Sequence, residues 1–159
     1  MKRAWNLYGG WREILFSRYL AAAFILVIPC VGLWQPGAGT EWADMSINIL
    51  PNLMGFSVAG MAIMLAFSHP ESLRAITQKG NETSYFLKVS ANLCHFLAAQ
   101  IVALIFAMIR KSGFDWSPFS YFGVLTLLYA VMVSIGAAGQ LFNTAVIMNK
   151  AANSKSGSK

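Results

Sequence analysis

The side chains with the greatest capacity for chemistry lie inside the most apolar parts of this sequence. In the run Tyr85–Ile109, Lys88, Asn92, His95 and Ala99 are spaced i, i+4, i+7 and i+11, which places them on one side of a helix. An ionisable imidazole within a membrane is a functional-site hypothesis, and His95 would then line a pore or sense pH. We favour the alternative, a neutral imidazole that hydrogen-bonds a neighbouring helix, because no acidic partner lies in the same run.

The amides of the last two apolar runs extend this polar face. Gln140 and Asn143 share one helix face with Gly136, at a depth where they could meet Asn92. A packed polar contact between helices is favoured there over a conduction path. Gln100 lies roughly 80° around its helix from Asn92 and is expected to bond another helix. The candidate polar intramembrane face is therefore Asn92, His95, Gln100, Gln140 and Asn143.

Catalytic groups and metal ligands do not gather anywhere in the sequence. All six Asp and Glu residues fall in predicted loops or in the leader, whereas cation-coupled transporters usually hold a carboxylate in the membrane. Cys30 and Cys94 have no zinc or redox spacing, and neither His69 nor His95 has an orienting acid in its run. We therefore expect no catalytic residue, no metal and no cofactor.

Helices in a bilayer must position these side chains. Hydrophobic residues form 57% of the chain and charged residues 11%, and 159 residues are too few to bury so much apolar surface without lipid. A helix needs about 20 residues to cross about 30 Å of hydrocarbon. The sequence predicts an all-α, polytopic integral membrane protein whose domain of residues 19–148 holds four transmembrane helices, at about 19–34, 45–67, 85–109 and 121–148.

Two of the four runs differ from the ideal length. The first is short unless Arg18 snorkels from its opening turn, and a cleaved signal peptide is disfavoured because the basic leader is long and lacks a convincing cleavage site. The fourth is too long to stand upright, so it should tilt, bend near Gly136 and Gly139, or protrude into the cytoplasm. Trp34 and Trp42 lie near run ends, as residues of an aromatic belt would.

The breaks and ends of the runs carry further expectations. Pro29 and Pro51 predict bends in the first two helices, and Asp44 is placed to cap the second. Residues 1–18 mix basic and aromatic side chains and predict a cytoplasmic interfacial segment. Residues 149–159 predict a disordered cytoplasmic tail.

Orientation follows from the distribution of Lys and Arg. With both ends inside, the cytoplasmic segments hold ten basic residues and the outer loops hold two, Arg110 and Lys111. Because Lys and Arg are retained on the cytoplasmic side, this imbalance predicts an N-in/C-in topology. The basic residues lie beside the predicted spans and lack the stacking aromatics of a nucleic-acid groove. The expected partners are the lipid bilayer and a cytoplasmic protein, with no direct nucleic acid binding.

The second run carries a stripe of small side chains. Gly55, Ala59, Ala62 and Ala66 repeat at i, i+4, i+7 and i+11. Small residues at this spacing let two helices approach closely, which is how helices associate in lipid. This candidate helix-packing stripe would serve another helix of the same chain or a second copy, and it predicts a homo-oligomer in the second case.

The same helix resembles a segment of small, uncharacterised bacterial membrane proteins with four predicted helices. The shared pattern is LPxLxGFSxxGxAIxxxFS, which lies here within Ile49–Ser68, about an eighth of the chain. The positions that carry it are Leu50, Pro51, Gly55, Phe56, Ser57, Gly60, Ala62 and Ile63. The membrane subunit of the Kiwa anti-phage defence system is similar in general shape. The resemblance implies an oligomeric sensor in the bacterial inner membrane that works with a cytoplasmic effector.

These observations favour a non-enzymatic membrane subunit that self-associates and exposes a basic cytoplasmic face to a partner. The alternative is a small oligomeric channel or pore-forming effector lined by Asn92, His95, Gln140 and Asn143. An uncoupled transporter is disfavoured by the missing carboxylate, and an enzyme comes last.

Overall fold

The computed structural model describes residues 17–66 and 84–156, and all regular structure in those ranges is helical. The helices are α3 (Arg18–Val27), α4 (Val31–Trp34), α5 (Glu41–Ala66), α7 (Tyr85–Lys111) and α8 (Ser117–Ser156). The all-α prediction is therefore confirmed for this part of the chain. Most of the predicted interfacial segment, and residues 68–83 of the loop expected between the second and third spans (68–84), lie outside the described residues.

Three helices of the described ranges are long and apolar enough to cross a membrane. They are Glu41–Ile63 within α5, Tyr85–Lys111 and Ser117–Lys150 within α8. This confirms the coarse prediction of a multi-pass membrane protein. Because α5 begins at Glu41, Asp44 lies in its first turn, and the prediction that Asp44 caps the helix is wrong. Thr40 precedes the helix, and its hydroxyl donates to Asp44 Oδ2 over 3.1 Å.

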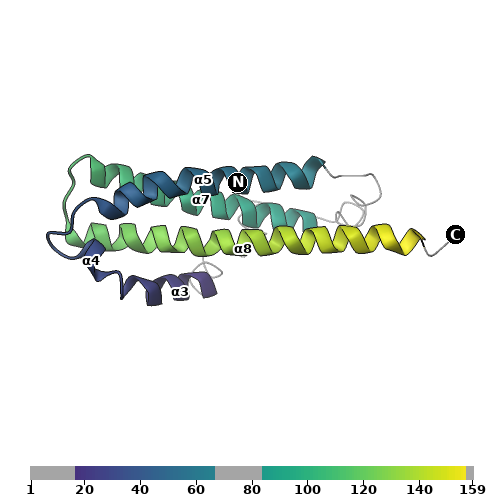
Figure 1. Cartoon of the computed structure of the whole chain (residues 1–159), viewed down its shortest axis with the longest axis horizontal. Helices are drawn as coiled ribbons and strands as arrows, with labels where there is room; N and C mark the ends of the chain where they lie inside the picture. Colours follow the sequence, from purple (N-terminus) through teal and green to yellow (C-terminus); the bar gives the residue numbers. More distant parts are fainter. Residues whose placement is uncertain (1–16, 67–83, 157–159) are drawn as a thin grey trace.

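The longest helix, α8, is the common partner of the others. It packs against α7, α3 and α5, with α3 and α5 on opposite sides of it (Figure 1). It runs without interruption through Gly136 and Gly139 and protrudes beyond the ends of α5 and α7 (Figure 1). Helix also includes residues 149–156 of the predicted tail, and the last three residues of that tail lie outside the described ranges. The strong helix formers Ala151 and Ala152 favour the continuation.

The first apolar run is divided at Pro29, as its lack of a backbone N–H predicts. The ten residues of α3 and the four of α4 are each shorter than a span. Together they follow α8 closely, because Tyr19 lies against Gly136 while the Trp34 and Tyr121 ring centroids are 5.1 Å apart. The two contacts are fifteen residues apart on both antiparallel segments, from Tyr19 to Trp34 and from Tyr121 to Gly136. Along α8 this separation is about 22 Å at 1.5 Å per residue.

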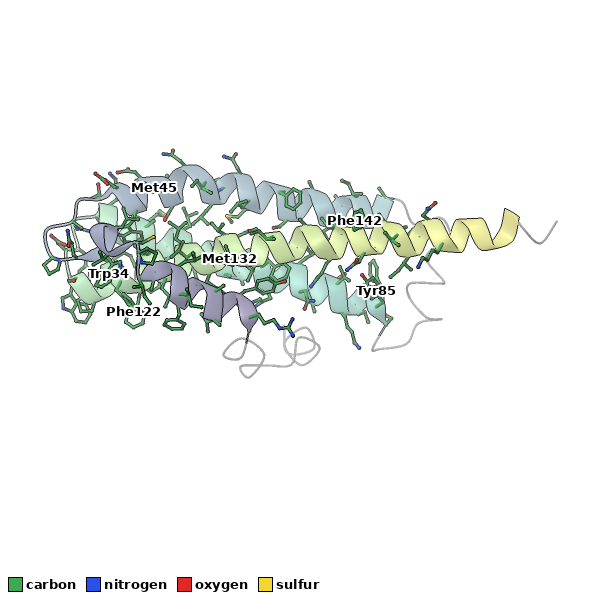
Figure 2. The ribbon with its side chains drawn as sticks, turned by 60° about the horizontal axis from the view of Figure 1, so that its bottom comes forward. Trp34, Met45, Tyr85, Phe122, Met132 and Phe142 are labelled. Carbon is green, nitrogen blue, oxygen red and sulfur yellow. The ribbon has the colours of Figure 1, made fainter. Side chains whose placement is uncertain are left out.

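The core forms where these helices meet α8. Its buried members include Val27, Trp42, Leu93, Val124 and Val133. Trp42 is fully buried, so its assignment to an aromatic belt is wrong; its ring packs over Gly123, where a Cβ would overlap it. Figure 2 shows Trp34 and Phe122 at one end of the bundle and Tyr85 and Phe142 toward the other.

Candidate functional site

One fully buried polar side chain joins the three long helices of the bundle. Gln100 of α7 is fully buried, and its Nε2 donates to Ser134 Oγ of α8 over 2.8 Å and to Ser57 Oγ of α5 over 3.4 Å. Both serines are buried as well, at 2% exposure for Ser57 and 6% for Ser134. Hydrogen bonds across helices stabilise association in lipid, where no water competes for the donors.

The orientation of the Gln100 amide is fixed by its neighbours. The Ser57 hydroxyl donates to the Leu53 carbonyl over 3.0 Å, and the Ser134 hydroxyl donates to the Ala130 carbonyl over 2.7 Å. Both hydroxyl protons are thereby committed, so each oxygen must accept, and the amide must present its NH₂ group. Gln100 Oε1 is buried without a hydrogen-bond partner among the described residues. The cluster therefore holds the helices together and offers no reactive group.

His95 bonds a neighbouring helix, as the structural interpretation of this residue expects. Its Nε2 lies 2.8 Å from the hydroxyl of Tyr129 on α8, and the imidazole is half-buried. The His95 ring also makes edge-on contacts with Tyr129 and Phe96, with centroids 6.1 Å apart in both cases. A tyrosine hydroxyl both donates and accepts, so it can bond Nε2 of a neutral imidazole in either tautomer without an acidic partner.

The remaining members of the predicted polar face differ from one another in burial and in their contacts. Asn92 is half-buried, whereas Asn143 is exposed. Gln140 Oε1 is buried without a hydrogen-bond partner in the described ranges. One turn away, the Thr144 hydroxyl lies 3.4 Å from the Tyr85 hydroxyl and joins α8 to the start of α7. The face thus divides into separate contacts, and Gln100 makes its bonds independently of the others.

The small-residue stripe lies outside the bundle. Gly55, Ala59, Ala62 and Ala66 are all exposed, and a Cβ placed at Gly55 would meet nothing within 4 Å. The buried side of α5 is formed instead by residues such as Leu50, Ser57 and Gly60, where a Cβ at Gly60 would collide with Leu141. The stripe therefore serves no helix described in this chain.

Charges are paired at the end of the bundle that holds α4, which we call the paired-charge end. Arg110 is buried at 6% exposure and lies 3.0 Å from Asp115 Oδ1, and it donates to the carbonyls of Ala38 and Phe114. Lys111 Nζ lies 2.9 Å from Asp44 Oδ1. These contacts tie the loop before α5 to the loop before α8. The two basic residues of the predicted outer loops are thus matched by acids.

The opposite end, which we call the basic end, has a different character. Arg18, Lys88 and Lys150 are exposed toward this end but at different levels along α8, because Tyr19 lies against Gly136 and Lys150 follows Gly136 by fourteen residues. The Asp and Glu residues of the described ranges all lie toward the paired-charge end. Cationic side chains at this position suit anionic headgroups or an acidic protein surface.

Sequence reasoning missed the partners of the buried polar groups, namely Ser57, Tyr129 and Ser134. One signal was available for the serines, because a serine in an apolar helix commonly donates to the carbonyl four residues earlier and leaves its oxygen free to accept. The described residues contain no group of three or more His, Cys, Asp or Glu side chains placed to hold a metal ion.

Comparison with known proteins gives no relative: no protein-family model, no curated protein and no solved structure matches the chain.

Proposed function

We propose that the chain is a non-enzymatic, multi-pass membrane subunit that self-associates and presents a basic cytoplasmic face to lipid headgroups or a protein partner. The observation that carries the proposal is the placement of the small-residue stripe on the outer surface of α5. A surface suited to close helix contact, left uncovered by the described residues of its own chain, is suited to another chain. The buried polar side chains support a structural role for the interior, because Gln100 and His95 bond neighbouring helices.

The proposed topology has four spans with both termini in the cytoplasm. The run of α3 and α4 along about 22 Å of α8 covers most, but not all, of about 30 Å of hydrocarbon, and on this ground we count the segment as a short fourth span. The exposed cations of the basic end support its cytoplasmic placement.

Two sets of fusions test the topology. Reporters at Gly37 and Gly113 should be active only with an enzyme that works outside the cytoplasm, and tags at the two termini should both be protected from added protease in sealed cells. Termini on opposite sides would reduce the spans to three, and an inside-active reporter at Gly37 would reverse the orientation.

Mass measurement tests self-association. The full chain, extracted in mild detergent, should have a protein mass that is a multiple of 17.4 kDa. The oligomer should persist on dilution in native mass spectrometry. A monomer in both detergent and lipid nanodiscs would overturn the proposal.

A role as a sensor in bacterial defence extends this proposal and rests on the motif of α5 alone. It places the chain in a bacterial inner membrane, with a cytoplasmic effector as its partner. Cells that express the chain with its neighbouring genes should resist phage more strongly than cells in which only this gene is interrupted. Equal plaque counts for the two strains over a broad phage panel would overturn the role in defence. The proposed self-association would not be affected, because mass measurement tests it separately.

A further inference from the structure

The outward face of α5 carries more than small residues. Two asparagines extend the stripe toward the start of α5 at the same spacing. Steps of four and three residues alternate along Asn48, Asn52, Gly55, Ala59, Ala62 and Ala66. This is a seven-residue repeat, the spacing that keeps one helix face against a partner helix over its whole length. All six residues are exposed. We call these six residues the α5 seam.

The two amides lie where lipid is a poor solvent for them. Asn52 is eleven residues beyond Glu41, or about 16 Å along the helix, close to the middle of a hydrocarbon layer about 30 Å thick. Its Nδ2 donates to the Asn48 carbonyl over 3.1 Å. The Oδ1 atom of Asn52 and the side-chain amide of Asn48 make no hydrogen bond to another described residue. An amide transferred to hydrocarbon without a hydrogen-bond partner is strongly disfavoured. The side chains of Asn48 and Asn52 therefore require polar partners at this surface.

A proline adds an acceptor beside the seam. Pro51 lies inside α5 and has no N–H, so the carbonyl of Ile47, one turn earlier, lacks its helical partner. In a membrane each such carbonyl seeks another donor. The Asn48 and Asn52 side chains of a facing helix supply donors of the required kind.

We propose that the α5 seam packs in parallel against the α5 seam of a second copy, with Asn48 and Asn52 hydrogen-bonded across the pair. This inference rests on the proposed self-association and names its surface. Copies inserted in one membrane share one orientation, so a two-fold axis along the membrane normal brings each seam residue to its own counterpart at equal depth. An amide is both donor and acceptor and is therefore complementary to itself.

The two halves of the seam have different tasks. From Gly55 to Ala66 the small side chains let the helix backbones approach closely, which provides the packing contact. Asn52 and Asn48 form bonds only when the two helices are in register, as a buried asparagine does in a coiled coil. The amides therefore set the register and the small residues set the distance.

Disulfide formation in membranes tests the surface. In a chain made cysteine-free by Cys30→Ser and Cys94→Ala, a single cysteine at Ala59 should crosslink two copies several-fold faster than one at Val58. Val58 is 55% exposed and neighbours Ala59 in depth, but it lies about 80° around the helix from the centre of the seam. Equal rates, faster crosslinking at Val58, or no crosslink at either position would overturn the inference.

Dissociation measurements test the amides. Asn52→Leu should weaken self-association at least about threefold, as expected for the loss of interhelical hydrogen bonds in a membrane. Ile49→Leu, on another exposed part of the same helix, should leave it unchanged. An oligomer that keeps its mass and affinity in Asn52→Leu overturns the seam while the proposed self-association stands. A wild-type chain that is monomeric in lipid overturns both.

Discussion

The two sides of α5 differ in how their polar groups are satisfied. On the side that faces the bundle, Ser46 donates to the Trp42 carbonyl over 2.8 Å, and Ser57 both donates to Leu53 and accepts from Gln100. On the other side Asn48 and Asn52 are exposed, with one local bond between them. Within the described ranges, α5 therefore carries one polar face whose groups bond other helices or their own helix and one polar face with no partner on another helix.

The difference follows from the number of hydrogen-bonding groups on each side chain. Serine satisfies itself within one helix, because its short hydroxyl reaches the carbonyl four residues earlier. Asparagine has two donors and an acceptor and cannot satisfy all of them on its own helix. Asparagine side chains on the outer face of a candidate span therefore indicate a surface where a second copy supplies the missing hydrogen-bond partners.

The largest expected effect comes from filling the close contact on the inner face. Gly123→Ala places a Cβ against the rigid Trp42 ring, and we expect the free energy of unfolding to fall by about 1–3 kcal/mol, as for other overpacked cores. Unfolding by SDS in mixed micelles measures it. Gly139→Ala, with nothing within 4 Å of the new Cβ, is the matched control on the same helix and should be neutral or stabilising by up to about 1 kcal/mol. Similar destabilisation in both variants would contradict the Trp42 contact.

A smaller effect is expected at the three-helix amide cluster. Ser134→Ala removes the acceptor at 2.8 Å from Gln100 Nε2 and should lower the free energy of unfolding by about 0.6–2 kcal/mol. Ser57→Ala removes the acceptor at 3.4 Å and should lower it by less. Combining each serine variant with Gln100→Met completes a double-mutant cycle, and purely additive losses would exclude the bonds.

His95 separates the structural interpretation from the channel alternative. We expect His95→Ala to lower the free energy of unfolding by about 1 kcal/mol or less, through loss of the contact with Tyr129. Tyr129→Phe should have a similar effect, and the double variant should be less destabilised than the sum. If His95 gates a pore, His95→Ala would instead abolish a pH dependence of ion flux in liposomes between about pH 5 and 8. Flux that is absent at every pH in the wild type would remove the channel alternative.

The sequence predicts the helices well and their contacts poorly. Hydropathy identified the three candidate spans, because an apolar stretch of 20 residues has few stable alternatives. Periodicity put Gly55 and Ala59 on one face, but it could not tell whether that face points into the bundle or away from it. It also could not find Tyr129, whose role depends on how α8 is aligned with α7. The prediction for Trp42 was wrong because an aromatic side chain near a helix end suits either the membrane interface or a protein core.

The smallest effect is expected at Asp44, an exposed acid of α5, whose surroundings differ from those of Asn48 and Asn52. Asp44 is exposed like Asn48, but it lies one turn nearer the paired-charge end and already contacts Lys111. Both side chains are largely exposed, at 51% for Asp44 and 41% for Lys111, so water screens the pair. A double-mutant cycle of Asp44→Asn and Lys111→Met should give a small favourable coupling energy that shrinks as salt is raised. Self-association should be unaffected in both variants. An Asp44→Asn chain that loses its oligomer as completely as Asn52→Leu would mean that the contact between copies extends over this end, and the division of α5 into a water-facing charge and membrane-facing amides would fail.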